Sequence, residues 1–227
     1  MRMRKKPNLI PRLERCAPVR IDDPAALAGH WRELMPAAAE LHLELGCGKG
    51  KFTAELAAAR PDVLLTAVER VPEALVMAME KAMAQDLHNV RFISADVEHL
   101  TEFFAPGEVD CIYLNFCDPW PRKKHAGRRL THRHFLEKYC QVLVPGGQLH
   151  FKTDNQDLFT FSLEEFAASG WTTEQVTRNL HENGPVGIMT GYEEKFYGQG
   201  VPICRCVART PHREAEPGRQ ETEACAS

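Results

Sequence analysis

The sequence of 227 residues lacks several features that would assign it to a specialised class of protein. It has no apolar run approaching the ~18 residues that a membrane helix requires, and no apolar core follows its basic start, so a secretory signal is not expected. The formal net charge is only −3, so nucleic acid would have to bind through a local basic patch. We therefore expect a cytoplasmic protein without a membrane partner.

Paired cysteines are also lacking, because the eight cysteines are scattered without any Cys-x-x-Cys motif. In a chain of this length, such scatter is typical of reduced thiols in a core rather than of a disulfide scaffold. Cys204 and Cys206 face the same side of a predicted strand. The spacing of the other candidate ligands fits no common zinc site, and no metal is expected; these candidates are His132, His134 and Cys140.

Short apolar runs alternate with helical segments through most of the chain. Strands are predicted over residues 41–45, 63–68, 90–94, 109–116, 148–152, 172–177 and 203–207. Helices are predicted over 23–34, 49–60, 72–85, 134–143 and 157–169. This alternation predicts an α/β, Rossmann-like fold in which a mostly parallel seven-stranded sheet has helices on both faces. Ligands bind such sheets beyond the carboxyl ends of the strands.

The two ends of the chain differ from this central region. Residues 1–20 are basic and rich in proline, which predicts a flexible N-terminal arm. Residues 210–227 are polar and lack a core pattern, which predicts a disordered tail. Residues 21–209 are then expected to form a single domain.

A glycine-rich turn follows the first of the seven predicted strands. The pattern Gly46-x-Gly48-x-Gly50 allows a tight turn and close approach to a ligand, because no side chain intrudes. The turn alone is a weak signal, and it fits neither the dinucleotide nor the phosphate-loop spacing. Read from Glu44, the pattern Glu-x-Gly-x-Gly resembles the first motif of class I methyltransferases, which use S-adenosylmethionine.

Acidic residues close the strands beside this turn. Glu69 ends the second strand, where a carboxylate can accept hydrogen bonds from both ribose hydroxyls. Asp96 follows the third strand and is expected to contact the adenine amino group, and Glu44 is expected to contact the amino-acid end of the cofactor. For each acid the alternative is a solvated strand end or a helix cap.

The segment after the fourth strand combines a carboxylate, a rigid loop and a run of cations. In Asp118-Pro119-Trp120-Pro121 the prolines stiffen the loop and the tryptophan offers a flat apolar face. Six cations follow within a dozen positions: Arg122, Lys123, Lys124, Arg128, Arg129 and Arg133. In a net-acidic protein this run predicts an anion-binding patch. Its place next to Asp118 favours contact with RNA over a merely solvated face.

Three segments together resemble the bacterial tRNA (guanine-N7)-methyltransferases. They are residues 118–131, Phe151-Lys152-Thr153-Asp154-Asn155, and Thr190-Gly191-Tyr192-Glu193-x-Lys195-Phe196. The resemblance extends from about residue 40 to 208, and the start Met-Arg-x-Arg-Lys-Lys is typical of one branch. The chain departs from the family at residue 122, where it has Arg and Lys is usual; Arg keeps the charge but prefers bidentate geometry.

This resemblance implies S-adenosylmethionine as cofactor and tRNA as partner, with methyl transfer to N7 of a variable-loop guanosine, position 46 in tRNA numbering. It implies that Asp118 is the catalytic carboxylate and also lines the cofactor site together with Glu44, Gly46, Gly48, Glu69 and Asp96. It assigns the target guanosine to Arg122, Asp154, Thr190, Gly191, Tyr192 and Glu193. It assigns the tRNA backbone to Lys124, His125, Arg128 and Arg129.

Guanine N7 carries a free lone pair and needs no base to activate it. Positioning and electrostatics should therefore dominate the chemistry. We expect Asp118 to stabilise the positive charge that develops on the purine. Asp154 or Glu193 is expected to accept hydrogen bonds from guanine N1–H and the exocyclic amine.

Two alternatives remain at the level of sequence. A class I methyltransferase that acts on a small molecule or protein would explain the glycine turn but not the basic run. A non-catalytic RNA-binding protein would predict damage to the cofactor acids, and none is seen. The sequence leaves monomer and homodimer equally open.

Overall fold

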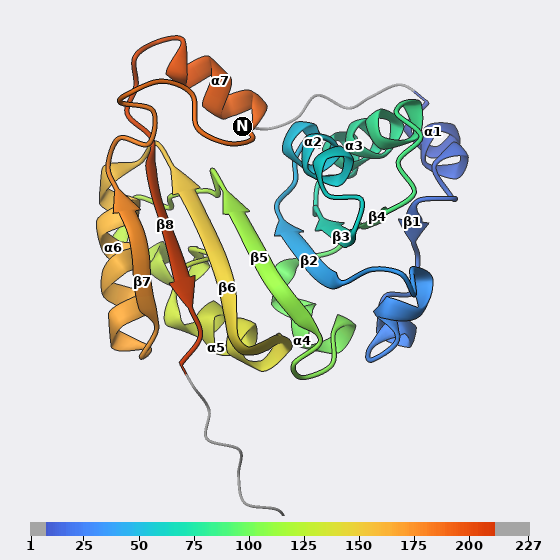
Figure 1. The fold of residues 1–227 in the computed structure, drawn as a ribbon, viewed down its shortest axis with the longest axis horizontal. Coiled ribbons are helices and arrows are strands. Elements are labelled where there is room, and N and C mark those ends of the chain that lie inside the picture. The colour runs from blue at the N-terminus through green and yellow to red at the C-terminus, as the bar shows by residue number, and fades with distance from the viewer. Residues whose placement is uncertain (1–7, 212–227) are drawn as a thin grey trace, which may run out of the picture.

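One eight-stranded sheet forms the centre of the computed structural model, which describes residues 8–211 (Figure 1). The strands are β1 Arg20–Ile21, β2 Glu40–Leu45, β3 Val63–Val68, β4 Val90–Ile93, β5 Val109–Asn115, β6 Leu143–Thr153, β7 Thr172–Thr177 and β8 Cys204–Arg209. Their order is β1-β4-β3-β2-β5-β6-β8-β7. The pairs from β1 to β6 are parallel, whereas β8 is antiparallel to both of its neighbours.

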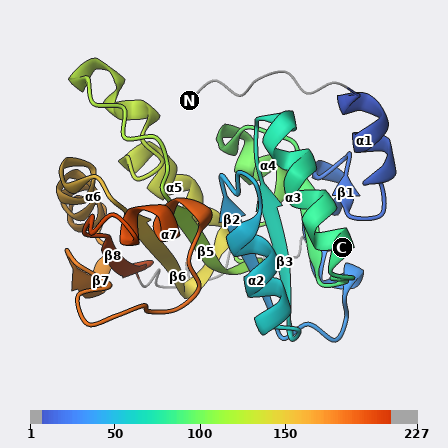
Figure 2. The same ribbon diagram turned by 90° about the horizontal axis from the view of Figure 1, so that it is seen from above.

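Helices cover both faces of this sheet (Figure 2). They are α1 Leu9–Arg15, α2 Lys51–Ala59, α3 Pro72–Ala84, α4 Leu100–Phe103, α5 Arg133–Val142, α6 Gln156–Ala168 and α7 Gly191–Tyr197. Short 3-10 turns are η1 Ala25–Leu27, η2 Trp31–Leu34, η3 Val97–His99 and η4 Lys123–Arg128. The predicted α/β fold with a mostly parallel sheet is confirmed.

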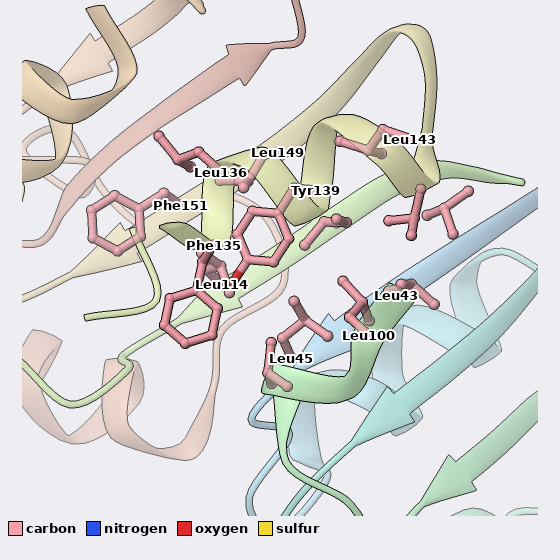
Figure 3. Packing of buried hydrophobic residues seen from close by; sticks show 14 of the residues in the cluster. Leu43, Leu45, Leu100, Leu114, Phe135, Leu136, Tyr139, Leu143, Leu149 and Phe151 are labelled. Carbon is pink, nitrogen blue, oxygen red and sulfur yellow. The ribbon is translucent and has the colours of Figure 1, made fainter. Parts of the chain in front are cut away.

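The alternating direction of strand side chains divides the core into two clusters. On β3, Leu64 belongs to the cluster beneath α4, α5 and α6, whereas Leu65 belongs to the cluster beneath α1, α2 and α3. Figure 3 shows the first cluster, in which Phe135 and Tyr139 of α5 pack toward Leu114 of β5. β3 is buried along its whole length because helices cover both faces of the sheet at this strand.

The sheet has one strand more than predicted, because the N-terminal segment is built into the fold. Residues 8–20 were expected in a flexible arm, but the structure forms helix α1 there and pairs β1 with β4. Arg12 of α1 forms a two-pronged ion pair with Glu80 of α3, and Cys16 and Val19 are buried in the core. Residues 1–7 of the predicted arm and 212–227 of the predicted tail lie outside the described residues.

The predicted helix over 23–34 is wrong, because two short 3-10 turns occupy this segment. Asp23 does accept a hydrogen bond from Ala26 N, as a cap would. Gly29 then adopts a left-handed φ of +83°, which an α-helix does not allow. Trp31 is fully buried and its indole N–H donates to the carbonyl of Phe103 at 2.8 Å. Burial of this large side chain outweighs the local helical preference.

Close contact between α2 and α3 depends on the glycine that ends the glycine-rich turn. Gly50 has φ +68°, and a Cβ built on it would clash with Cβ and Cα of Ala78 on α3. We expect Gly50→Ala to lower the free energy of unfolding by about 2–4 kcal/mol, because left-handed strain adds to overpacking against backbone. Urea denaturation measures this loss.

Gly107→Ala is the matched control for this variant, because Gly107 has φ +69° and no described atom within 4 Å of the added Cβ. It should lose only the part that comes from strain, about 1–2 kcal/mol. Equal losses for the two variants would show that the contact with Ala78 contributes nothing.

Candidate active site

The predicted acidic residues meet at one edge of the sheet. Strands β4, β3, β2, β5 and β6 are parallel neighbours, so their carboxyl ends lie at the same edge, at the top of Figure 1. In that order they are followed by Asp96, Glu69, the turn 46–50, Asp118 and Asp154. From β2 the sheet extends to β3 and β4 on one side and to β5 and β6 on the other. The strand order therefore reverses between β2 and β5, and ligands bind at this switch point in such sheets.

Backbone hydrogen bonds hold the glycine-rich turn on the end of β3. Gly46 N and Cys47 N both donate to the carbonyl of Val68, at 2.8 and 3.2 Å. Gly48 N donates to Oε2 of Glu69 at 3.0 Å. Gly46 and Gly48 have φ of +81° and +56°, and a Cβ at either would meet no described atom within 4 Å. The turn therefore leaves open space on the side where a ligand would approach.

Glu69 and Asp96 both have structural contacts at this edge. Glu69 accepts from Gly48 N through one oxygen and from Val71 N, at 2.9 Å, through the other. Each oxygen retains a second lone pair for a ligand. Asp96 caps η3, because its Oδ1 accepts a hydrogen bond from Glu98 N at 3.0 Å. The alternative role of a helix cap therefore applies to this one oxygen of Asp96.

Glu44 is a buried carboxyl group below the turn. Its side chain lies on β2 with 2% exposure, and Thr53 Oγ1 of α2 donates to it at 2.5 Å. Burial raises the pKa of Glu44 to about 7, against the hydrogen bond from Thr53, which lowers it. A carboxyl group in this state can accept a cationic ligand at little further cost in desolvation.

Asn115 is a buried side chain that sequence reasoning missed. It ends β5 beside Glu44, whose ionised form it favours. Neither amide atom has a well-formed hydrogen bond among residues 8–211. A buried amide with an unmade hydrogen bond costs about 1–3 kcal/mol, so the capacity that the contact with Glu44 leaves unused is available to a ligand. The signal in the sequence was a polar residue at the end of an otherwise apolar strand.

The loop that carries Asp118 is held in a strained conformation. Phe116 and Trp120, on either side of it, have φ of +55° and +40°, which non-glycine residues adopt at a cost. Phe116 N donates to the carbonyl of Lys152 at 2.9 Å, and its ring stacks on Phe196 of α7 with centroids 6.2 Å apart. The Asp118 side chain is exposed and makes no hydrogen bond or ion pair within the described chain.

The cations that follow this loop fall into two groups, those that contact other parts of the protein and those that are exposed. Arg133 forms an ion pair with Glu165 of α6, at 2.8 Å. Arg129 donates to the carbonyls of Pro119 and Trp120, at 3.0 and 3.1 Å. These two guanidinium groups hold protein structure together, which differs from the expectation that Arg129 follows the tRNA backbone.

The other four cations form an exposed surface, called here the basic surface. They are Arg122, Lys123, Lys124 and Arg128, and none forms an ion pair within residues 8–211. The guanidinium of Arg128 lies 5.0 Å from the centroid of the Trp120 ring, and the ring of His125 lies 5.8 Å from it. The tryptophan thereby fixes the surface relative to the Asp118 loop.

Thr190 to Glu193 begin helix α7, which the sequence analysis did not predict. Thr190 Oγ1 accepts from Glu193 N at 3.0 Å, and the Glu193 carboxylate accepts from Thr190 N at 3.2 Å. This is a capping box, and the pattern Thr-x-x-Glu is its signal in the sequence. Glu193 is fully buried, so the expectation that it contacts the guanine edge conflicts with its position, whereas Tyr192 is 53% exposed.

Neither a metal site nor a membrane segment is found in the described part of the chain. Residues 8–211 contain no group of three or more His, Cys, Asp or Glu side chains placed to hold a metal ion. Cys204 and Cys206 are fully buried in the core. Over the same residues, every helix is too short or too polar to cross a bilayer.

The fold and this edge define the class I methyltransferases. The structure of the 16S rRNA methyltransferase KamB superposes with a TM-score of 0.62 at 15% identity, covering 81% of this chain and 93% of that one. The 16S rRNA (adenine(1408)-N(1))-methyltransferase from Catenulisporales acidiphilia, solved with S-adenosylmethionine, gives 0.59 at 15% identity, covering 83% and 93%. At such low identity these likenesses concern the fold.

Sequence relatives identify the family within this class. A family described as "Putative methyltransferase" matches residues 38–206. The tRNA (guanine-N(7)-)-methyltransferase of Geobacillus kaustophilus (strain HTA426) is 44% identical over 95% of this chain and its own whole length. That of Geobacillus thermodenitrificans (strain NG80-2) is 43% identical with the same coverage. The chain belongs to the tRNA (guanine-N7)-methyltransferase family.

The raised pKa of Glu44 predicts how stability depends on pH. The folded state holds its proton up to about pH 7, whereas the ordinary value is 4.5. The stabilising contribution is therefore complete below pH 4.5 and lost as pH rises through 7. Relative to Glu44→Gln, which cannot ionise, the wild-type protein should lose at most about 3 kcal/mol between pH 4.5 and 8.

Urea denaturation of the ligand-free protein across this pH range measures the difference between the two stability profiles. Glu164→Gln changes an exposed carboxylate of α6 and serves as the control. Parallel profiles for wild type and Glu44→Gln would contradict the assignment of a buried, protonated Glu44.

Proposed function

We propose that this protein transfers the methyl group of S-adenosylmethionine to N7 of a guanosine in tRNA, the activity named in its relatives. The observation that carries the proposal is the position of Asp118. Its loop follows β5, directly beside the glycine-rich turn after β2, and continues into the basic surface. One short loop thus joins the proposed cofactor site to a surface suited to phosphates.

The residues at the carboxyl edge fit the groups that the cofactor carries. S-adenosylmethionine supplies a methyl group on a sulfonium, so that transfer leaves a neutral thioether behind. Glu44 matches its ammonium group, and the buried Asn115 amide beside Glu44 matches its carboxylate. Glu69, with a free lone pair on each oxygen, matches the ribose hydroxyls, and Asp96 the adenine amino group. Gly46 and Gly48 leave space for its close approach.

Asp118 is the proposed catalytic carboxylate. Guanine N7 is a nucleophile without deprotonation, so the protein needs to align the base and stabilise the positive charge that grows on it. The Asp118 carboxylate is free of other partners in the described structure, and the strained loop fixes its direction. A fixed negative charge near the purine favours the charged product-like state over the neutral base.

Recognition of guanine is assigned to residues around the same edge. Asp154, between β6 and α6, makes no side-chain hydrogen bond or ion pair within residues 8–211. It can therefore accept from guanine N1–H and the exocyclic amine. Arg122, Thr190, Gly191 and the exposed Tyr192 complete the proposed base site, and Tyr192 offers an aromatic face for stacking.

Lys124 and Arg128 of the basic surface, together with the neighbouring His125, are proposed to bind the tRNA backbone. Their phosphate contacts would offset the few kcal/mol needed to unstack the target base. We further propose that the base is the variable-loop guanosine, position 46 in tRNA numbering, and that the protein works where tRNA matures, in the cytoplasm.

A direct assay tests the function. Unmodified tRNA transcript is incubated with the protein and radiolabelled S-adenosylmethionine, and the modified nucleoside is located by mass spectrometry of nuclease fragments. We expect 7-methylguanosine at position 46 and none in a transcript with adenosine there. Label in another base, in protein or in a small molecule would overturn the proposal.

Substitution of Asp118 should separate catalysis from folding. We expect Asp118→Asn to lower kcat by about 10²–10³-fold, because charge stabilisation is lost, with an unchanged melting temperature. Single-turnover methyl transfer at saturating cofactor measures the rate. Asp86→Asn, an exposed acid after α3 whose φ of 53° asparagine tolerates, is the control. Equal rates for all three proteins would remove Asp118 from the mechanism.

The two kinds of basic residue should differ in their salt dependence. Arg128→Ala should weaken tRNA binding and reduce the slope of log K against log salt by about 0.7–0.9, the loss of one phosphate contact. Arg133→Ala, from the same run but paired with Glu165, should leave the slope unchanged. Filter binding between 50 and 200 mM salt measures both; equal slopes for wild type and Arg128→Ala would exclude Arg128 from the interface.

A further inference from the structure

A buried ion pair joins α7 to the central sheet beside the candidate active site. Nζ of Lys152, on β6, lies 2.6 Å from Oε2 of Glu193, and Nε2 of His181 lies 3.0 Å from Oε1. Glu193 is fully buried and Lys152 is 8% exposed. Buried ion pairs are costly to desolvate and stabilise little for their cost. Its presence here therefore calls for a role beyond stability.

Lys152 is also tied to the segment that leads into α7. Its Nζ donates to the carbonyl of Ile188 at 3.0 Å, and the same atom lies 5.4 Å from the centroid of the Phe52 ring. An ammonium group has three N–H donors. Glu193 and the Ile188 carbonyl take two of these donors, and the Phe52 ring is a further neighbour of the ammonium group, so Lys152 is bound mainly to other parts of the protein.

The backbone of Lys152 contacts the other half of the site. Its carbonyl accepts from Phe116 N, the residue that begins the strained Asp118 loop. The Phe116 ring in turn stacks on Phe196 of α7. One residue of β6 therefore binds the Asp118 loop through its main chain and the approach to α7 through its side chain.

A second lysine connects the same segment to the cofactor side. Lys51 opens α2 directly after the glycine-rich turn, and its Nζ donates to the carbonyl of Met189 at 3.2 Å and pairs with Glu194 at 3.0 Å. Figure 2 looks down on α7 lying over the ends of β6 and β8. Residues 188–194 are thus held from β6 by Lys152 and from α2 by Lys51.

We propose that Lys152 is a positioning residue for methyl transfer, which sets the distance between the Asp118 loop and the segment 188–193, whose residues Thr190, Gly191 and Tyr192 belong to the proposed base site. This inference rests on the proposed function. In this role Lys152 acts through its contacts with Glu193 and Ile188 and not through a direct contact with substrate or cofactor. A displacement of about 1 Å at a reacting centre can cost 10²-fold in rate, so loss of this tether should appear in kcat.

Lys152→Met removes the charge and both hydrogen bonds while it keeps the length of the side chain. We expect kcat for tRNA methylation to fall by about 10–100-fold, with KM for tRNA and the Kd of S-adenosylmethionine changed by less than about threefold. A purely structural role predicts a lower melting temperature with normal kcat for the folded protein. That result would overturn the proposal.

Two further variants sharpen this test. Lys152→Met combined with Glu193→Gln leaves no unpaired buried charge, so it should fold, yet it still lacks the tether to Ile188 and should keep the low kcat. Wild-type kcat in this double variant would contradict the proposal. Lys138→Met is the matched control, because Lys138 likewise contacts one carboxylate and one carbonyl, both of Glu98; its kcat should stay within about twofold.

Hydrogen–deuterium exchange separates this inference from the proposed function, since it needs no substrate. Peptides that span residues 186–197 should exchange faster in Lys152→Met than in wild type, while those of β3 should not change. Unchanged exchange over 186–197 would overturn the positioning role whatever the substrate is. Failure of wild-type protein to methylate tRNA, with exchange altered as expected, would overturn the proposed function alone.

Discussion

Parallel pairing of β2 with β3 on one side and with β5 on the other is the constraint on which the candidate site depends. The register sets Glu44 opposite Ala67 and Tyr113, so the three strands end together and their loops share one edge. The glycine-rich turn can then hydrogen-bond to the end of β3, and Asn115 comes to lie beside Glu44. A sheet with another order would scatter the same residues over both ends.

Charge at this edge is divided between buried and exposed groups. Glu44 is buried, and burial raises its pKa to about 7. Asp118, in contrast, is exposed on a loop whose backbone is strained at Phe116 and Trp120. Cations nearby are divided in the same way: Arg129 braces the loop through two carbonyls, while Arg128 lies over Trp120 and faces outward. One acidic protein can therefore present a cationic surface next to a carboxylate without the two neutralising each other.

Much of the fold could be predicted from local patterns, and the failures have identifiable causes. The sequence pattern located all seven longer strands, but the two-residue β1, which pairs with β4 next to the contact of α1 with α3, is too short to give a periodic signal. Residues 23–34 look helical, yet burial of Trp31 and the left-handed Gly29 break the helix. For the site, spacing predicted which acids end the strands, but not that Glu193 would be buried against Lys152 and His181.

By itself, the sequence determined the α/β architecture, the glycine-rich turn and the family, because these depend on periodicity, glycine spacing and long motifs that are read along the chain. Only the tertiary structure decided which polar groups are free. Arg128 and Arg129 are adjacent and chemically identical, but Arg128 is exposed, whereas Arg129 donates hydrogen bonds to the carbonyls of Pro119 and Trp120. Asn115 and Lys152 differ in the same way: the Asn115 amide keeps hydrogen-bonding capacity beyond its contact with Glu44, whereas Nζ of Lys152 is bound to Glu193 and to the carbonyl of Ile188. Hydrogen-bond partners come from residues distant in sequence, and no local pattern encodes them.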